Sequence, residues 1–134
     1  MIQARCRVLI VDDQLNWRSA FTAILAQDYD IETVGSYLEA EKLMSEDSYD
    51  VVILDIRLKD EDVFDATGIS LARRIRASQP QTRIVIVTGY SESIDSGTVE
   101  QVVDAYIEKA PEEGKFRVSE FKTLIRMLVD ETKD

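Results

Sequence analysis

Five short apolar runs alternate with longer amphipathic segments along this chain of 134 residues. Three of the runs, the first, third and fourth, are apolar without alternation, as is typical of parallel strands whose two faces are both covered. We therefore expect five strands that contribute to one buried sheet. The runs are "RVLIV" (7–11), "IETVG" (31–35), "DVVIL" (50–54), "RIVIV" (83–87) and "AYI" (105–107).

Between and after these runs, apolar residues recur at the spacing of an amphipathic helix. The pattern is less regular in the stripe that begins at Tyr37. Strands that are each followed by a helix indicate an α/β fold, with helices on both faces of a doubly wound parallel sheet. The stripe that begins at Val99 extends into the apolar run at 105–107, so we expect only the first part of this stripe to be helical. The stripes are Trp17, Ala20, Phe21 and Ile24; Tyr37, Ala40, Leu43 and Met44; Gly68, Leu71, Ala72 and Ile75; Val99, Val102, Val103 and Tyr106; and Phe121, Leu124, Ile125 and Leu128.

Length and composition narrow the classes of function. The length is that of one ordinary domain. Sixteen basic and 26 acidic residues give a formal net charge of −10, which argues against nucleic acid as a direct partner. The apolar runs are too short to span a membrane, and no secretion signal is evident, so we expect a cytoplasmic protein. The chain has no histidine. This excludes catalytic triads that use histidine as the base and metal sites that use histidine ligands, so any chemistry must rely on carboxylates, hydroxyls and lysine.

Polar side chains stand at the carboxyl ends of the predicted strands. Asp12 and Asp13 follow the first strand, Asp55 follows the third, Thr88 follows the fourth, and Lys109 comes after the fifth. The carboxyl ends of parallel strands lie along one edge of a sheet, and ligands of open α/β sheets bind at this edge. We therefore expect these side chains to form one site.

Three of these residues predict a cation site. If the second and third strands flank the first, right-handed crossovers bring Asp12 and Asp13 next to Asp55, because neighbouring strands are about 4.8 Å apart. Three carboxylates repel one another unless a cation lies among them, and a site with only oxygen ligands favours Mg²⁺ or Mn²⁺ over zinc. We then expect that Asp12→Asn or Asp13→Asn leaves the metal-free fold no less stable. The alternative is that Asp12 and Asp13 cap the following helix from a solvated turn.

These motifs resemble those of receiver domains from two-component response regulators, over nearly the whole chain. The resemblance implies a flavodoxin-like (βα)5 fold with strand order 2-1-3-4-5. It also implies that residues 1–134 form a single receiver domain, with no output domain in this chain. The matching motifs are "VDD" at Asp12 and Asp13, "ILDIRL" at Asp55, "VTGY" at Thr88, and "AYIEK" at Tyr106 and Lys109.

The resemblance also assigns a function. Asp55 is the expected phosphoacceptor, taking the group from the phosphohistidine of a sensor histidine kinase or a histidine phosphotransfer protein. The metal ligands would be Asp12, Asp13, Asp55 and the backbone carbonyl of Arg57, while Lys109 and Thr88 would contact the phosphoryl group. The chain would catalyse its own phosphorylation and dephosphorylation and would not be a turnover enzyme.

The same resemblance predicts a switch formed by Thr88 and Tyr106. If Thr88 moves toward the phosphoryl group, Tyr106 can enter the space that it leaves. The predicted output surface comprises the helix after Thr88, the strand at 105–107 and the last helix. Its partner would be a downstream protein, an output domain outside this chain, or a second copy in a homodimer.

Each residue of the predicted site also has a purely structural interpretation. Asp55 could cap a turn, Lys109 could be an ordinary solvated lysine, Thr88 could be a β-former at a strand end, and Tyr106 could be an aromatic core residue. Two other functions remain open at this point. One is a degenerate receiver that acts only in docking or dimerisation. The other is a Mg²⁺-dependent phosphohydrolase, although haloacid-type enzymes have a second acid where this chain has Arg57.

The sequence departs from the family pattern at two places. Proline usually follows the lysine directly, whereas here the order is Lys109, Ala110, Pro111. A cis peptide is mainly a proline feature, so either it precedes Pro111 or the loop is built differently. The connection after Asp55 is also long, and we expect a solvated loop that recognises a partner. Its acids are Asp60, Glu61, Asp62 and Asp65.

Overall fold

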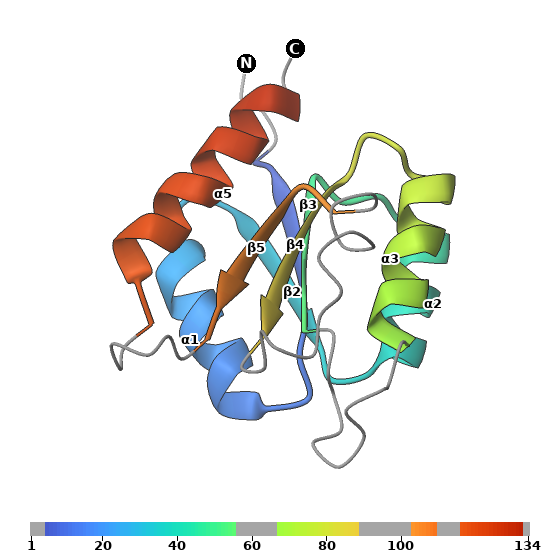
Figure 1. The fold of residues 1–134 in the computed structure, drawn as a ribbon, viewed down its shortest axis with the longest axis horizontal. Coiled ribbons are helices and arrows are strands. Elements are labelled where there is room, and N and C mark those ends of the chain that lie inside the picture. Colours follow the sequence, from blue (N-terminus) through green and yellow to red (C-terminus); the bar gives the residue numbers. More distant parts are fainter. Residues whose placement is uncertain (1–4, 56–66, 89–102, 110–115, 133–134) are drawn as a thin grey trace.

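The computed structural model describes residues 5–55, 67–88, 103–109 and 116–132. In these residues the chain forms five strands and four helices (Figure 1). The strands are β1 (Arg7–Val11), β2 (Asp30–Val34), β3 (Val51–Leu54), β4 (Arg83–Thr88) and β5 (Ala105–Glu108). The helices are α1 (Leu15–Leu25), α2 (Tyr37–Glu46), α3 (Thr67–Ser78) and α5 (Val118–Thr132).

The five strands form one parallel sheet in the order β2-β1-β3-β4-β5. This order confirms the predicted α/β fold, and the strand bounds agree with the apolar runs to within one residue. Val11 of β1 pairs with Leu54 of β3 and with Val34 of β2, so these three strands end at the same level. The helix expected around Val99 and Val102 lies outside the described residues.

Helices cover both faces of the sheet. Helices α2 and α3 lie on one face, and α1 and α5 lie on the other (Figure 1). Successive side chains of a strand point to opposite faces, so an unbroken apolar run supplies both cores. The core under α2 and α3 takes Leu9, Val11, Val34, Val52, Leu54, Ile84 and Ile86 from the strands. The core under α1 and α5 takes Val8, Ile10, Val51, Ile53, Val85 and Val87.

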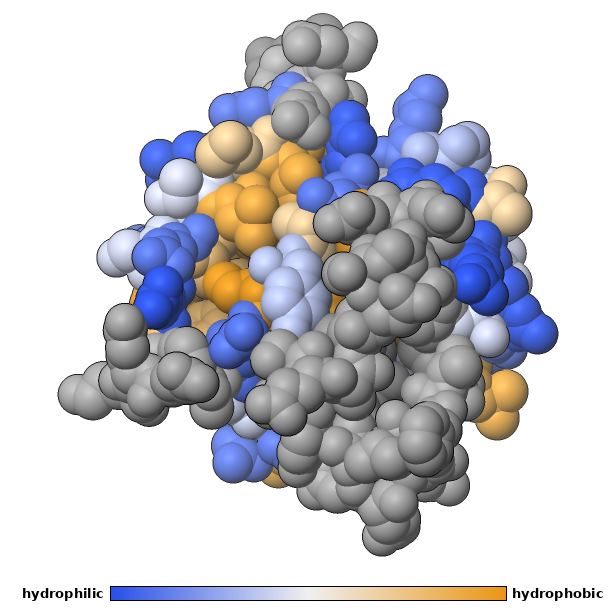
Figure 2. All heavy atoms as spheres, in the orientation of Figure 1, coloured by the Kyte–Doolittle hydropathy of each residue, from blue (hydrophilic) through white to orange (hydrophobic). Residues whose placement is uncertain are grey.

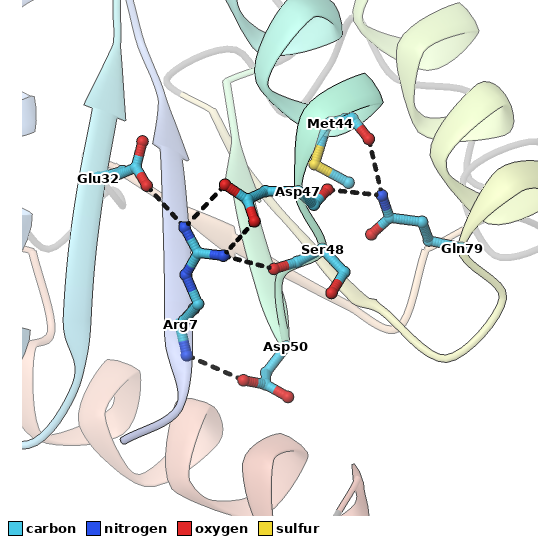
Figure 3. Close-up of polar contacts among 7 residues, drawn as sticks. All are labelled: Arg7, Glu32, Met44, Asp47, Ser48, Asp50 and Gln79. Atoms are coloured by element: carbon cyan, nitrogen blue, oxygen red, sulfur yellow. Dashed lines mark hydrogen bonds and ion pairs between the residues drawn. The ribbon is translucent and has the colours of Figure 1, made fainter. Parts of the chain in front are cut away.

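A polar network holds the edge of the sheet where the strands begin (Figure 3). The Arg7 guanidinium lies 2.9 Å from Oε1 of Glu32 and 2.9 Å from Oδ1 of Asp47, and its carbon is 4.6 Å from the centroid of the Tyr49 ring. The Arg7 backbone N–H donates to Oδ2 of Asp50 at 2.8 Å. One arginine therefore joins β1, β2 and the segment that leads into β3.

None of the described helices is both long enough and apolar enough to cross a lipid bilayer.

Candidate functional site

Asp12 continues β1 at the edge where the strands end. Its backbone N–H donates to the carbonyl of Val34 at 3.1 Å, and its side chain is buried, with the residue only 1% exposed. Its Oδ1 accepts a hydrogen bond from the backbone N–H of Gln14 at 2.9 Å. Asp13 is exposed. The two adjacent aspartates therefore differ, since the first is fixed inside the site and the second lies at its surface.

The residue at the N-cap of α1 shows whether either aspartate caps this helix. The N-cap residue is Gln14, and its side chain makes no capping hydrogen bond. One oxygen of the Asp12 carboxylate accepts the N–H of that cap residue, and the other, Oδ2, points toward Lys109 at the sheet edge. Asp12 therefore shapes the turn between β1 and α1 without being the N-cap itself.

Asp55 follows β3, the central strand. Its backbone N–H donates to the carbonyl of Val11 at 2.9 Å, and the residue is 4% exposed. Its backbone carbonyl accepts a hydrogen bond from the hydroxyl of Tyr37 at 2.8 Å. The start of α2 thus fixes the end of β3. The sequence pattern places Tyr37 only in an apolar stripe, and its hydroxyl is the one signal that could have indicated this polar contact.

The structure brings the three predicted carboxylates together. One oxygen from each of Asp12, Asp13 and Asp55 lies within 4.8 Å of the other two. Two oxygens bound to the same Mg²⁺ at about 2.1 Å can be at most about 4.2 Å apart, so small side-chain rotations would bring the three into one coordination sphere. The donors are all carboxylate oxygens, as a hard divalent cation prefers. These residues therefore fit Mg²⁺.

Lys109 lies among the acids, and the solvated-lysine interpretation is wrong. Its side chain is 7% exposed, and its Nζ is 2.9 Å from Oδ2 of Asp55 and 2.6 Å from Oδ2 of Asp12. Both contacts are ion pairs, and the one with Asp55 is also a hydrogen bond. Three carboxylates and one ammonium carry a formal charge of −2, which one divalent cation would neutralise.

Arg18 on α1 also supports the site, although no motif in the sequence indicates this role. Its Nη1 donates to the backbone carbonyl of Asp12 at 2.7 Å. Gly35, which follows β2, leaves room for this side chain, because a Cβ at Gly35 would lie 3.1 Å from the same Nη1. The arginine ties α1 to the turn that carries both aspartates.

Of the remaining predicted residues, the structure describes Thr88 and Tyr106. Thr88 ends β4, which is the neighbour of β3, and it pairs with Glu108. Tyr106 on β5 is 37% exposed, and this partial burial agrees with both the switch role and aromatic packing. The carbonyl of Arg57, the acidic loop after it, and the peptides that join Lys109 to Pro111 fall outside the described residues.

Residues 8–118 match the sequence model of the response regulator receiver domain. The chain belongs to this family. The family places it in two-component signal transduction as a receiver that accepts phosphoryl groups. The chain is 32% identical over 104 residues to the hydrogenase transcriptional regulatory protein HoxA of Bradyrhizobium diazoefficiens, an alignment that covers 76% of this chain and 20% of HoxA.

A second relative is protein-glutamate methylesterase/protein-glutamine glutaminase 3 of Rhodopseudomonas palustris, 36% identical over 98 residues. That match covers 71% of this chain and 26% of the relative. The chain therefore spans a fifth to about a quarter of the length of these two curated relatives.

Solved receiver structures have the same fold. A CheY-like receiver domain protein from Methanospirillum hungatei superposes with a TM-score of 0.81 at 25% identity, covering 97% of this chain and 98% of the other. The response regulator TrrA of Thermotoga maritima, solved in complex with Mg²⁺-BeF, gives a TM-score of 0.75 at 28% identity and covers 92% of this chain and 98% of its own. Receiver domains bind Mg²⁺, and the acidic cluster of this chain agrees with that property.

Proposed function

We propose that Asp55 is the phosphoacceptor of this receiver domain. The observation that carries the proposal is the placement of a buried carboxylate at the end of β3, hydrogen-bonded to the Lys109 ammonium. Strand β3 pairs with β1 on one side and β4 on the other. Asp55 therefore lies between the Asp12–Asp13 pair and the end of the strand that carries Thr88.

The donor in this proposal is a phosphohistidine on a sensor histidine kinase or a histidine phosphotransfer protein. An Asp55 carboxylate oxygen forms the new O–P bond, while the P–N bond breaks and the imidazole nitrogen keeps its electron pair. The Lys109 ammonium is within reach of the incoming phosphoryl oxygens and stabilises the charge on them. Asp12, Asp13 and Asp55, with the carbonyl of Arg57, would hold Mg²⁺ or Mn²⁺, which supplies further positive charge when bound.

The proposed output surface includes α5 and β5. Figure 2 shows hydrophobic residues gathered between these two elements. Exposed apolar side chains on them are Tyr106, Val118 and Met127, with 37%, 43% and 58% of their surface accessible. In this proposal the Thr88 hydroxyl bonds the phosphoryl group, and Tyr106 changes its rotamer and alters the surface. A downstream protein, an output domain or a second copy of this chain would bind there.

A phosphodonor experiment tests the assignment of Asp55. The wild type is incubated with acetyl phosphate and Mg²⁺, and intact mass is followed over time. We expect one phosphoryl group, lost slowly and removed by hydroxylamine, and none on Asp55→Asn. A phosphorylated Asp55→Asn protein would overturn the assignment. Rapid continuous release of phosphate would indicate a phosphohydrolase, and a protein that is never labelled would indicate a docking module.

A further inference from the structure

Four aromatic rings form a cluster beside the acidic site. Trp17 on α1 is half-buried, and its ring centroid lies 5.4 Å from that of Phe21 and 5.6 Å from that of Phe116. Phe21 also contacts Phe121 of α5, with 5.2 Å between the ring centroids. Contacts with several neighbouring rings limit the orientations that the indole can adopt.

The Lys109 ammonium faces the Trp17 ring. Its Nζ lies 5.1 Å from the ring centroid, within the roughly 6 Å over which a cation is attracted to an aromatic face. An ammonium has three N–H donors, and two carboxylates, those of Asp12 and Asp55, lie beside this one. The indole therefore covers a further side of the ammonium. Because the Lys109 side chain is 7% exposed, water does little to weaken this attraction.

We propose that Trp17 is a positioning residue for Lys109, an inference that rests on the proposed function of Asp55. A lysine ammonium stands on a flexible four-carbon stem, so other groups must hold it in place. Two acids already attract Lys109, and a third acid would neutralise charge that the phosphoryl oxygens require. The ring attracts the ammonium through its quadrupole and carries no formal charge, so it holds Lys109 without cancelling that charge.

This arrangement has a specific consequence for the phosphorylation step. The ammonium contacts both Asp12 and Asp55 in the structure, and it must turn toward the phosphoryl oxygens when the new bond forms at Asp55. The indole face stays beside Lys109 through such a rotation, because α1 and the aromatic cluster fix it. Trp17 therefore keeps the ammonium close to the reacting oxygens without itself contacting the substrate.

Three variants separate positioning from packing. Trp17→Leu removes the ring and retains an apolar side chain, whereas Trp17→Phe retains a smaller aromatic face. Phe21→Leu is the matched control, because it removes a neighbouring ring of the same cluster and keeps Trp17, which α1 and the contact with Phe116 still hold. All rates are measured with acetyl phosphate and Mg²⁺ at a temperature where thermal melts show each variant to be folded.

We expect Trp17→Leu to lower the maximal phosphorylation rate about two- to tenfold, the range for a cation–π contact, and Trp17→Phe to restore most of it. The control should remain within about twofold of the wild type, because it leaves this contact intact. A wild-type rate for Trp17→Leu, or an equal loss for Phe21→Leu, would overturn the proposal. If Trp17→Leu does not fold, the comparison of Trp17→Phe with Phe21→Leu decides it, and the former must be slower.

A second measurement does not depend on phosphorylation. The ring current of Trp17 should shift the NMR signals of the Lys109 ε-methylene protons upfield, with the assignment made from Lys109→Met. The shift should persist in Phe21→Leu and disappear in Trp17→Leu, and its presence in Trp17→Leu would show that Trp17 does not face Lys109. If the wild type takes up no phosphoryl group, the proposed function fails, while this signal still shows whether Trp17 holds Lys109.

Discussion

At the residue scale, Lys109 has a proposed chemical task and a structural one. It is close enough to Asp55 to contact a phosphoryl group there, and before any reaction it is the positive partner of two buried carboxylates. The family resemblance predicted only the first task. Breaking a buried ion pair by removing one partner costs more than the pair contributes, because the other charge remains buried without compensation. We therefore expect Lys109 to stabilise the metal-free protein in addition to its proposed chemical role.

Replacing Lys109 by Met tests this double role. We expect the free energy of unfolding without metal to fall by about 3 kcal/mol, because Asp12 and Asp55 then repel each other in a buried site. Mg²⁺ should bind the variant more tightly than the wild type, because the competing ammonium is gone. Urea unfolding in EDTA and a Mg²⁺ titration followed by the single tryptophan measure the two effects. Unchanged stability together with weaker Mg²⁺ binding would contradict the counter-ion role.

The sequence predicted the convergence of the acids because position along parallel strands determines it. Asp12 and Asp55 each follow an apolar run, and adjacent parallel strands place those ends side by side. It did not predict the contacts of Tyr37 and Arg18 with backbone carbonyls of the site. Those contacts depend on the reach and rotamer of single side chains, and no periodicity in a sequence encodes that information.

At the scale of the elements, the two edges of the sheet differ in character. The edge where the strands begin carries the Arg7 network, in which the guanidinium pairs with Glu32 and Asp47 and joins three segments of the chain, and these side chains are 35 to 52% exposed (Figure 3). The other edge gathers three acids around one cation. Water screens the charges at the first edge, which suits a structural connection, whereas the buried carboxylates of Asp12 and Asp55 are little screened and suit a site that binds a cation.

The Arg7→Lys variant tests whether the two edges of the sheet act independently. A guanidinium has two arms that can bond Glu32 and Asp47 together, whereas an ammonium is a point charge. We expect a loss of about 1 kcal/mol in the free energy of unfolding, because these side chains are partly exposed. The phosphorylation rate should stay at the wild-type value, because the site is at the opposite edge. A slower rate in folded protein would show that the edges are coupled.

At the scale of the whole molecule, Tyr49 links stability to alkaline pH. Burial, followed by the nearby Glu32 carboxylate, raises the pKa of Tyr49 to about 12. The unfolded chain has a tyrosine pKa near 10, so above that pH the unfolded state releases a proton that the folded state retains. The contribution of Tyr49 to stability is therefore complete below about pH 10 and is lost as the pH rises toward 12.

Tyr49→Phe removes this dependence. We expect the difference in unfolding free energy between wild type and variant to be constant below about pH 9, and the wild type to lose of the order of 2 kcal/mol relative to the variant by pH 12. Urea unfolding at a series of pH values measures it. Parallel curves for the two proteins across this range would show that the hydroxyl of Tyr49 titrates normally in the fold.

Divalent cations should stabilise the whole domain, and the two adjacent aspartates should differ in this respect. A ligand that binds only the folded state at ten times its Kd adds about 1.4 kcal/mol, which raises the melting temperature of a domain of this size by about 3 to 6 °C. Replacing either Asp12 or Asp13 by Asn should reduce this shift, because each supplies a carboxylate oxygen to the cluster. Thermal melts in EDTA and in millimolar Mg²⁺ at constant ionic strength measure it, because general screening would otherwise contribute.

The metal-free melts distinguish the two aspartates. Asp13 is exposed, so Asp13→Asn removes a repelling charge and should leave the metal-free protein at least as stable as the wild type. The sequence predicted the same for Asp12, but Asp12 is buried and its Oδ2 is 2.6 Å from Lys109, so Asp12→Asn should lower the metal-free melting temperature. Equal Mg²⁺ shifts in the wild type and both variants would show that the aspartates hold no cation. An unchanged metal-free melt for Asp12→Asn would show instead that the ion pair with Lys109 contributes little to the fold.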